Sequence, residues 1–147
     1  MVKYTWVKGE YPKDIVVTQV YGVTFKGTKI LIMKDGEKYH LIGGKPEKGE
    51  TFEDTLIREF YEEVNTELKD VHYLGYFIVE EENKRYAQVR MIAKIKKINE
   101  ERPDLDNGKI YERKLVEESK VLDYLEYYDQ IGISFINDAI ELAKEKY

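Results

Sequence analysis

The sequence predicts one α/β domain in which a mixed β-sheet lies between helices. Three observations favour this class. Runs of β-branched and aromatic residues alternate with turn signals, two segments place apolar residues at helical spacing, and the order of segments implies both hairpins and crossovers. With 147 residues, 42 % of them hydrophobic, the chain can form one substantial core but not two. We therefore expect a single domain over residues 1–147.

Three strands are expected in the first part of the chain. The first is rich in β-branched and aromatic residues and ends at a Lys-Gly-Thr turn. The second is an apolar run typical of a buried strand, and the tight turn Asp35-Gly36 leads into the third. The predicted strands cover residues 15–25, 29–34 and 38–42. A loop with Pro and Gly, residues 45–50, follows them.

A helix is predicted to begin after Thr51. Thr51 and Asp54 have the spacing of a capping box, in which the hydroxyl accepts a hydrogen bond from a free backbone N–H at the helix start. Apolar residues at helical spacing then define its buried stripe: Phe52, Leu56, Ile57, Phe60 and Val64. Three carboxylates project to one side of that stripe: Glu59, Glu62 and Glu63.

Five further elements complete the prediction. They are strands at 71–80, 85–98 and 109–116, a short helix near 119–126, and an amphipathic helix whose apolar stripe begins at Ile131. In the long strand, Arg90, Lys94 and Lys96 share the face opposite an apolar one. This basic face either contacts substrate phosphates or is solvated.

Composition and charge exclude several classes of function. The chain has no cysteine, which rules out disulfides, thiolate nucleophiles and thiolate-bound zinc. Its net charge of −5 argues against broad affinity for the nucleic-acid backbone. The first residues carry charges instead of an apolar run, and no stretch is long enough to span a membrane. We therefore expect a cytoplasmic protein that makes no membrane contact.

The three glutamates on one helix need an explanation. Like charges three and four residues apart repel by roughly 0.2–0.5 kcal/mol a pair. A hard cation such as Mg²⁺ or Mn²⁺ would turn that repulsion into coordination, because these ions prefer carboxylate oxygens. A solvated acidic face is the alternative for the trio alone, since 36 % of the chain is charged.

The glutamates belong to a longer pattern, which runs without a gap through Gly44, Glu50, Arg58, Glu59, Phe60, Glu62 and Glu63. In this pattern the sequence resembles the Nudix hydrolases, whose signature is G-x5-E-x7-R-E-U-x-E-E-x-G-U with U apolar. Asn65 stands where the signature has glycine, and asparagine enters the left-handed conformation more readily than other non-glycine residues. Thr66 replaces an apolar residue, and Ile42 stands where the family often has proline. No expected metal ligand is lost.

The resemblance implies the Nudix-type α/β/α sandwich and hydrolysis of the phosphoanhydride bond of a nucleoside diphosphate linked to another moiety. It implies Mg²⁺ or Mn²⁺ as cofactor, with Glu59, Glu62 and Glu63 as ligands. The backbone carbonyl of Gly44 is expected to help. Homodimers are common among proteins of this resemblance.

The remaining site residues have supporting roles in this interpretation. Arg58 is expected to pair with Glu50 and to hold the loop on the helix, which is a positioning role. Arg90 is the candidate for contact with substrate phosphates. For the general base, the family varies; the candidates are Glu62 within the signature and Glu112 downstream.

Two alternatives belong to other classes. A non-catalytic nucleotide-binding or scaffold domain could keep the fold, but such a domain is expected to lose carboxylates that are all present here. An acidic interaction domain without a ligand would show no stabilisation by metal and nucleotide. The identity of the substrate stays open among ADP-ribose, modified nucleoside triphosphates, dinucleoside polyphosphates and, less favoured by the acidic charge, the 5′ end of RNA.

Overall fold

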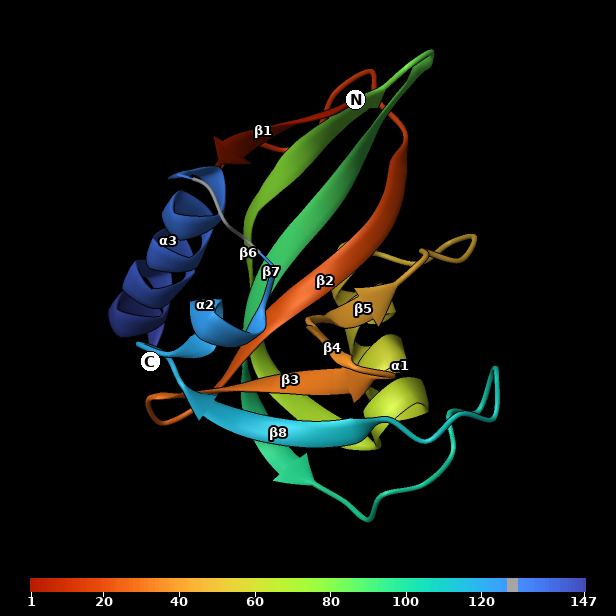
Figure 1. Ribbon diagram of the computed structural model, residues 1–147, viewed down its shortest axis with the longest axis vertical. Coiled ribbons are helices and arrows are strands. Elements are labelled where there is room, and N and C mark those ends of the chain that lie inside the picture. The colour runs from red at the N-terminus through yellow and green to blue at the C-terminus, as the bar shows by residue number, and fades with distance from the viewer. Residues whose placement is uncertain (127–129) are drawn as a thin grey trace.

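The computed structural model describes residues 1–126 and 130–147 and shows an α/β/α sandwich (Figure 1). Its strands are β1 (Val2–Lys8), β2 (Val17–Lys26), β3 (Lys29–Asp35), β4 (Lys38–His40), β5 (Ile42–Gly44), β6 (Thr66–Glu81), β7 (Lys84–Ile98) and β8 (Glu112–Glu117). Its helices are α1 (Phe52–Val64), α2 (Val121–Tyr124) and α3 (Gln130–Lys146). The predicted fold class is confirmed.

The described strands form one mixed sheet in the order β1-β6-β7-β2-β3-β4, with β5 paired to β2 and β8 paired to β3. The central pair, β2 and β7, is parallel. The other pairs are antiparallel. Because β5 leads directly into the α1 loop, its pairing with β2 fixes that loop in the middle of the sheet.

The helices cover opposite faces of the sheet (Figure 1). On one face, α1 buries Leu56, Phe60 and Val64 against a cluster that includes Val20 and Val89. On the other face, a second cluster contains Phe77 and Ile92 from the sheet and α3 side chains. The α3 members are Phe135, Ile136, Ala139 and Ala143. Each helix therefore has its own half of the core.

The α1 helix begins and ends as its sequence predicts. The Thr51 hydroxyl accepts from the Asp54 backbone N–H at 3.0 Å, and the Asp54 carboxylate accepts from the Thr51 N–H at 3.1 Å, which confirms the capping box. Asn65 ends the helix in the left-handed conformation, with φ 46° and ψ 49°. The prediction that Ile57 belongs to the buried stripe is wrong, because its side chain lies on the exposed side, with 42 % of its surface accessible.

One strand was not expected from the sequence. β1 has a charged residue near each end, yet it pairs with β6 along its whole length, from Val2 opposite Glu81 to Lys8 opposite Gly75. Its anchor is Trp6, whose ring packs on Phe77 at 4.9 Å. The Trp6 indole N–H also donates to Asp138 on α3 at 2.8 Å. Tertiary contacts rather than local pattern make this segment a strand.

Other boundaries also differ from the prediction. The expected strand at 38–42 is divided at Leu41 into β4 and β5, which pair with different neighbours. β6 begins at Thr66 instead of residue 71, because the chain pairs with the end of β7 as soon as α1 ends. β8 begins at Glu112 instead of 109, because Lys109 accepts a hydrogen bond from the Asp104 N–H within the preceding loop.

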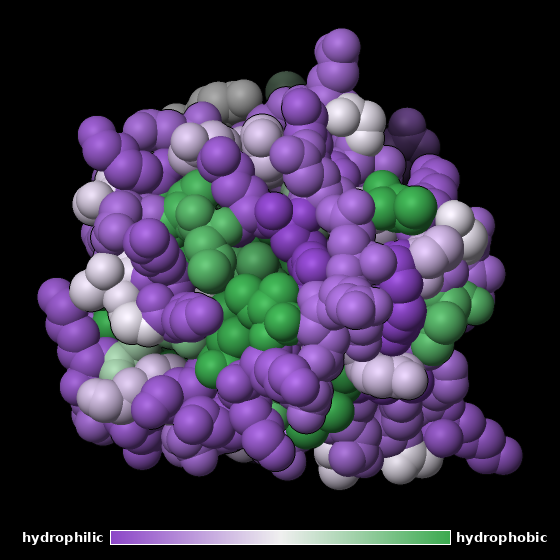
Figure 2. All heavy atoms as spheres, turned by 90° about the horizontal axis from the view of Figure 1, so that it is seen from below, coloured by the Kyte–Doolittle hydropathy of each residue, from purple (hydrophilic) through white to green (hydrophobic). Residues whose placement is uncertain are grey.

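The end of the molecule that lies lowest in Figure 1 shows where the core reaches the surface. Apolar side chains gather in a hollow in the middle of this face, and hydrophilic side chains surround them (Figure 2). None of the helices in the described part of the chain combines the length and apolar character that a bilayer crossing requires.

Candidate active site

The two glycines at the end of β5 allow unusually close contacts. A Cβ atom at Gly43 would lie 2.0 Å from the Val20 carbonyl oxygen, so only glycine lets β5 approach β2 here. A Cβ atom at Gly44 would lie 2.5 Å from the Cδ atom of Glu59. The carboxylate of Glu59 is therefore held directly against the backbone that begins the loop.

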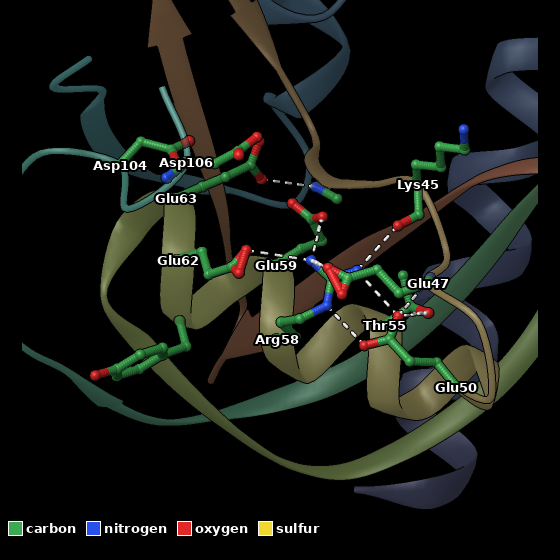
Figure 3. Close-up of polar contacts among 12 residues, drawn as sticks. Lys45, Glu47, Glu50, Thr55, Arg58, Glu59, Glu62, Glu63, Asp104 and Asp106 are labelled. Carbon is green, nitrogen blue, oxygen red and sulfur yellow. Dashed lines mark hydrogen bonds and ion pairs between the residues drawn. The ribbon is translucent and has the colours of Figure 1, made fainter. Parts of the chain in front are cut away.

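Arg58 clamps this loop to the start of α1. Its Nε donates to Glu50 Oε2 at 2.6 Å, and its Nη2 donates to Glu50 Oε1 and to the Lys45 carbonyl, both at 2.9 Å (Figure 3). Glu50 also accepts from the Glu47 N–H at 2.8 Å and from the Thr55 hydroxyl at 2.9 Å. The hydrogen bonds from Arg58 are the main reason that the pKa of Glu50 falls to about 2. The expected pair of Arg58 with Glu50 is present.

Arg58 also reaches two of the three expected metal ligands. Its Nη1 donates to Glu59 Oε1 at 2.8 Å and to Glu62 Oε1 at 3.2 Å. Both carboxylates are turned toward this guanidinium in the structure (Figure 3). A cation that replaced these contacts would have to draw both side chains away from Arg58.

Glu63 lies in a different environment at the other end of the helix. Its Oε2 accepts from the Gly43 N–H at 3.3 Å, and the side chain is mostly buried. Burial raises the pKa of Glu63 to about 8, and the charges of Glu59, Asp104 and Glu62 add to the rise. Burial likewise raises the pKa of Glu59. Several carboxylates thus crowd one site in which their negative charges repel each other.

Asp104 is the acidic residue that sequence reasoning did not select. It lies in a turn, in which Asp104 Oδ1 accepts from the backbone N–H groups of Asp106 at 2.7 Å and Asn107 at 3.4 Å. The Leu105 N–H then donates to the carbonyl of Glu62 at 3.2 Å, which docks the loop on α1. As a result Asp104, only 5 % exposed, lies beside Glu63 (Figure 3).

The family model described as NUDIX domain matches residues 15–132, which is most of the chain. The chain belongs to the Nudix family. No curated protein is similar enough in sequence to match it.

Solved structures of Nudix-type hydrolases share the fold. The Bacillus subtilis pyrophosphohydrolase BsRppH, in a mutant form, superposes with a TM-score of 0.72 at 18 % identity, over 99 % of this chain and 93 % of that one. An ADP compounds hydrolase has a TM-score of 0.65 at 15 % identity, over 91 % and 75 % of the two chains. A UDP-X diphosphatase has a TM-score of 0.64 at 17 % identity, over 95 % and 68 %. At these identities the likeness concerns the fold alone.

The departure from the Nudix signature at Asn65 has a structural reason. Asn65 adopts the left-handed conformation that the signature glycine would supply, and its side chain adds contacts that glycine cannot make. Its amide donates to the Glu100 carbonyl at 3.0 Å, and its Oδ1 accepts from Arg102 at 3.3 Å. Arg113 donates to the Val64 carbonyl at 2.9 Å. Two arginines thus satisfy the negative end of the α1 dipole and fix the loop that carries Asp104.

The structure does not bring Glu112 to the carboxylates. Glu112 is exposed at the first position of β8. Leu115 packs with the α1 cluster and Val116 with the α3 cluster, so alternation along the strand places Glu112 on the α3 face with Val116. Of the two downstream acids Glu112 and Asp104, Asp104 is the one that lies at the Nudix helix α1.

Arg90 is not part of a solvated basic face, which corrects that reading of the strand. Its side chain is 5 % exposed and lies over the rings of Tyr21, Phe77 and Phe135. Phe135 of α3 covers this part of β7, whereas Lys96 farther along the strand is exposed. Arg90 also lines a cavity of about 650 Å³ that reaches Gly43 and Glu63.

The donor set suits a hard divalent cation. Four carboxylates and the carbonyl at Gly44 offer only oxygen, which Mg²⁺ and Mn²⁺ prefer. As placed, no three acidic or histidine side chains of residues 1–126 and 130–147 form a ready metal site. Arg58 holds two of these side chains, Glu59 and Glu62. By the chemistry of their oxygen donors, the residues at this end of α1 fit the ion.

Proposed function

We propose that this Nudix hydrolase cleaves the phosphoanhydride bond of a nucleoside diphosphate linked to another moiety, with Mg²⁺ or Mn²⁺ as cofactor. One observation carries the proposal: Glu59, Glu62 and Glu63 share the end of α1 with the buried Asp104, beside a cavity large enough for a nucleotide. The fold shared with hydrolases of pyrophosphate-containing compounds supports it.

The carboxylates would hold the metal ion. Glu59 and Glu63 flank the backbone of Gly43 and Gly44, so they and the Gly44 carbonyl are the first candidates, with Glu62 as a third carboxylate ligand. When bound, the ion supplies positive charge that neutralises the diphosphate and polarises the phosphorus. Without such charge, an anionic substrate would be repelled from this end of the helix.

Arg58 positions the loop and the carboxylates and takes no part in breaking the substrate bond. It connects the loop carbonyl of Lys45, the carboxylate of Glu50 and the carboxylates of two metal-ligand candidates. If Glu59 and Glu62 turned from Arg58 to hold an ion, the bonds from Arg58 to Glu50 and Lys45 would remain and keep the loop in place. The clamp thus preserves the geometry at Gly44, where the reaction needs it.

A carboxylate at the acidic end of α1 serves as general base. In the reaction a water oxygen forms a bond to phosphorus, the bridging P–O bond breaks, and the water proton passes to the base. Glu62 is the candidate on the helix, and Asp104 takes the place of Glu112 as the candidate from a downstream segment. The products are a nucleoside monophosphate and the phosphorylated second moiety, and the phosphorus that water attacks decides which of them carries the new oxygen.

A panel of nucleotide-linked substrates tests this function. The chain is incubated with each substrate and Mg²⁺ or Mn²⁺ in ¹⁸O-labelled water, and mass spectrometry identifies which product carries the label. We expect Glu62→Gln and Glu63→Gln each to reduce turnover by about 100-fold or more with the fold retained. Glu53→Gln, in the exposed first turn of the same helix, is the matched control and should keep parental turnover.

Two outcomes contradict the proposal. If both carboxylate variants hydrolyse the best substrate at the parental rate, the site lies elsewhere. If nucleotides bind and stabilise the chain but no substrate is cleaved, the protein is the non-catalytic nucleotide-binding domain that the sequence left as an alternative.

A further inference from the structure

Arg90 is a buried cation that uses little of its hydrogen-bonding capacity. Its Nε has no partner among the described residues. Its Nη1 and Nη2 make only long contacts, 3.5 Å to the Val89 carbonyl and 3.4 Å to Gln88 Oε1. A buried guanidinium with unsatisfied N–H groups is costly, so a ligand that accepts from it would be favoured.

Aromatic rings surround the same guanidinium. Its carbon lies 4.8 Å from the centre of the Tyr21 ring, 4.9 Å from Phe77 and 5.4 Å from Phe135. These cation–π contacts explain how a charge can be held here. They engage the face of the guanidinium and not its N–H donors, which have only the two long contacts and no acceptor at Nε. A purely structural role therefore explains how the charge is held but not why these donors are left poorly paired.

The cavity connects Arg90 to the carboxylates. It is lined at Arg90 by Gln88, Phe77 and Tyr4 and also reaches Gly43 and Glu63. Gly43, Tyr21 and Arg90 stand in one row across β5, β2 and β7. Since neighbouring strands are about 4.8 Å apart, the backbones at the two ends of this row are roughly 10 Å apart. A nucleotide with its phosphates beside Glu63 would extend toward Arg90.

We propose that the Arg90 end of the cavity binds the nucleobase and selects guanine. Guanine presents two acceptors on one edge, O6 and N7, which match the paired N–H groups of an arginine. Adenine presents N7 beside an amino group, and that amino group would face the arginine donors. Tyr4, which lines the cavity and is 47 % exposed, offers aromatic surface for the flat face of the base. This inference rests on the proposed function, since the phosphates set the orientation.

The cavity argues against a phosphate at this position. Arg90 is the one arginine or lysine that lines it among the described residues, whereas Asp35, Glu63 and Glu126 contribute negative charge. A phosphate without a metal would meet rings and carboxylates there. A neutral base meets neither repulsion nor the cost of removing a second ion from water.

Binding of nucleoside monophosphates, which contain no phosphoanhydride bond, tests the selection independently of catalysis. Calorimetry with GMP, AMP and UMP, in the presence of Mg²⁺, should give a dissociation constant for GMP at least about tenfold lower than for AMP. Arg90→Lys keeps a positive charge but cannot donate as a fork, and Arg90→Met removes the charge. In both variants the GMP to AMP ratio should fall to within about twofold. Arg85→Met, an exposed arginine on the same strand, should leave the ratio unchanged.

Circular dichroism checks that each variant is folded, and the wild-type comparison needs no variant at all. Equal affinity of the wild-type chain for GMP and AMP overturns the inference. So does an unchanged ratio in folded Arg90→Lys. A uniform loss of all three nucleotides with the ratio preserved would show a phosphate contact and would also overturn it.

The same comparison separates this inference from the proposed function. If no nucleotide-linked substrate is hydrolysed but GMP is still preferred through Arg90, the proposed reaction fails and base selection stands. If guanine and adenine substrates are hydrolysed with equal kcat/KM, the reaction stands and base selection fails.

Discussion

The two ends of α1 treat the same type of side chain in opposite ways. At the first end, Glu50 receives two hydrogen bonds from Arg58 and others from Glu47 and Thr55, and its pKa falls to about 2. At the last end, Glu63 receives one bond of 3.3 Å and faces other carboxylates, and its pKa rises to about 8. One end is electrostatically complete, whereas the other is incomplete because its carboxylates repel one another.

This difference assigns the two ends to different tasks. The completed end stabilises the loop and needs nothing from solution. The incomplete end accepts repulsion among acids that a purely structural site would avoid. Variants at the first end should therefore change stability, and variants at the last end should change metal binding and turnover.

Substitution of the adjacent glycines is expected to have the largest effect. Gly44→Ala places a methyl group 2.5 Å from the Glu59 Cδ atom, and this flexible side chain can move, so the fold should survive while turnover falls by about 100-fold. Gly43→Ala meets the Val20 carbonyl at 2.0 Å and the Tyr21 Cα at 2.6 Å, which cannot move without breaking the sheet. Thermal unfolding and kcat/KM of both variants measure the difference. Parental turnover in Gly44→Ala would show that the position of Glu59 is unimportant.

A smaller effect is expected at the downstream acids. Asp104→Asn should lower turnover by about 10- to 100-fold, because Asp104 lies beside Glu63 in a docked loop. Glu112→Gln should leave turnover unchanged, because its side chain is on the opposite face of the sheet. Steady-state kinetics on the best substrate compares the two. The reverse order of effects would return Glu112 to the site and remove Asp104 from it.

Divalent metal should stabilise the chain through the incomplete end alone. Free Mg²⁺ or Mn²⁺ at ten times its dissociation constant should add about 1.4 kcal/mol to the free energy of unfolding. Glu63→Gln should lose this gain, since it removes a ligand, and Glu53→Gln should keep it. Thermal unfolding of each variant is measured with the metal and again in EDTA, and the difference between the two conditions gives the stabilisation by metal. An equal gain in Glu63→Gln would place the metal elsewhere.

The smallest effect concerns the completed end and depends on pH. The pKa of Glu50 is about 2 in the folded chain, below its ordinary value of 4.5. The Glu50–Arg58 pair therefore contributes stability above pH 4.5, and this contribution disappears as the pH falls toward 2. Urea unfolding of the wild-type chain and Glu50→Gln should differ most at neutral pH and converge in acid. A difference that grows on acidification would contradict the assigned direction.

Local patterns predicted the completed end well. Two contacts form there, the capping box of Thr51 with Asp54 and the ion pair of Arg58 with Glu50. Each joins residues within ten positions of each other, so the sequence spacing is enough to predict it. The fold class followed from the same kind of signal, and the family match confirms the resemblance carried by the signature.

The incomplete end could be predicted only in part. The three glutamates are local to one helix, but Asp104 arrives through a hydrogen bond between Leu105 and Glu62, which lie in separate elements. Arg90 was taken for part of an open strand face, but it is covered by rings from distant segments, among them Phe77 on β6 and Phe135 on α3. Contacts between distant segments decide such positions, and a window of neighbouring residues does not contain them.

The parallel pairing of β2 with β7 also has a consequence for how the protein is made. It joins residues 17–25 to residues 87–94, whereas the whole signature lies between them. A growing polypeptide therefore exposes its acidic helix before the strand that completes the row from Gly43 to Arg90 has been translated. Such long-range closure is slow in folding. The chain should acquire its proposed nucleotide site late, in one cooperative step, and shortened chains that end before β7 should be inactive although they contain every residue of the motif.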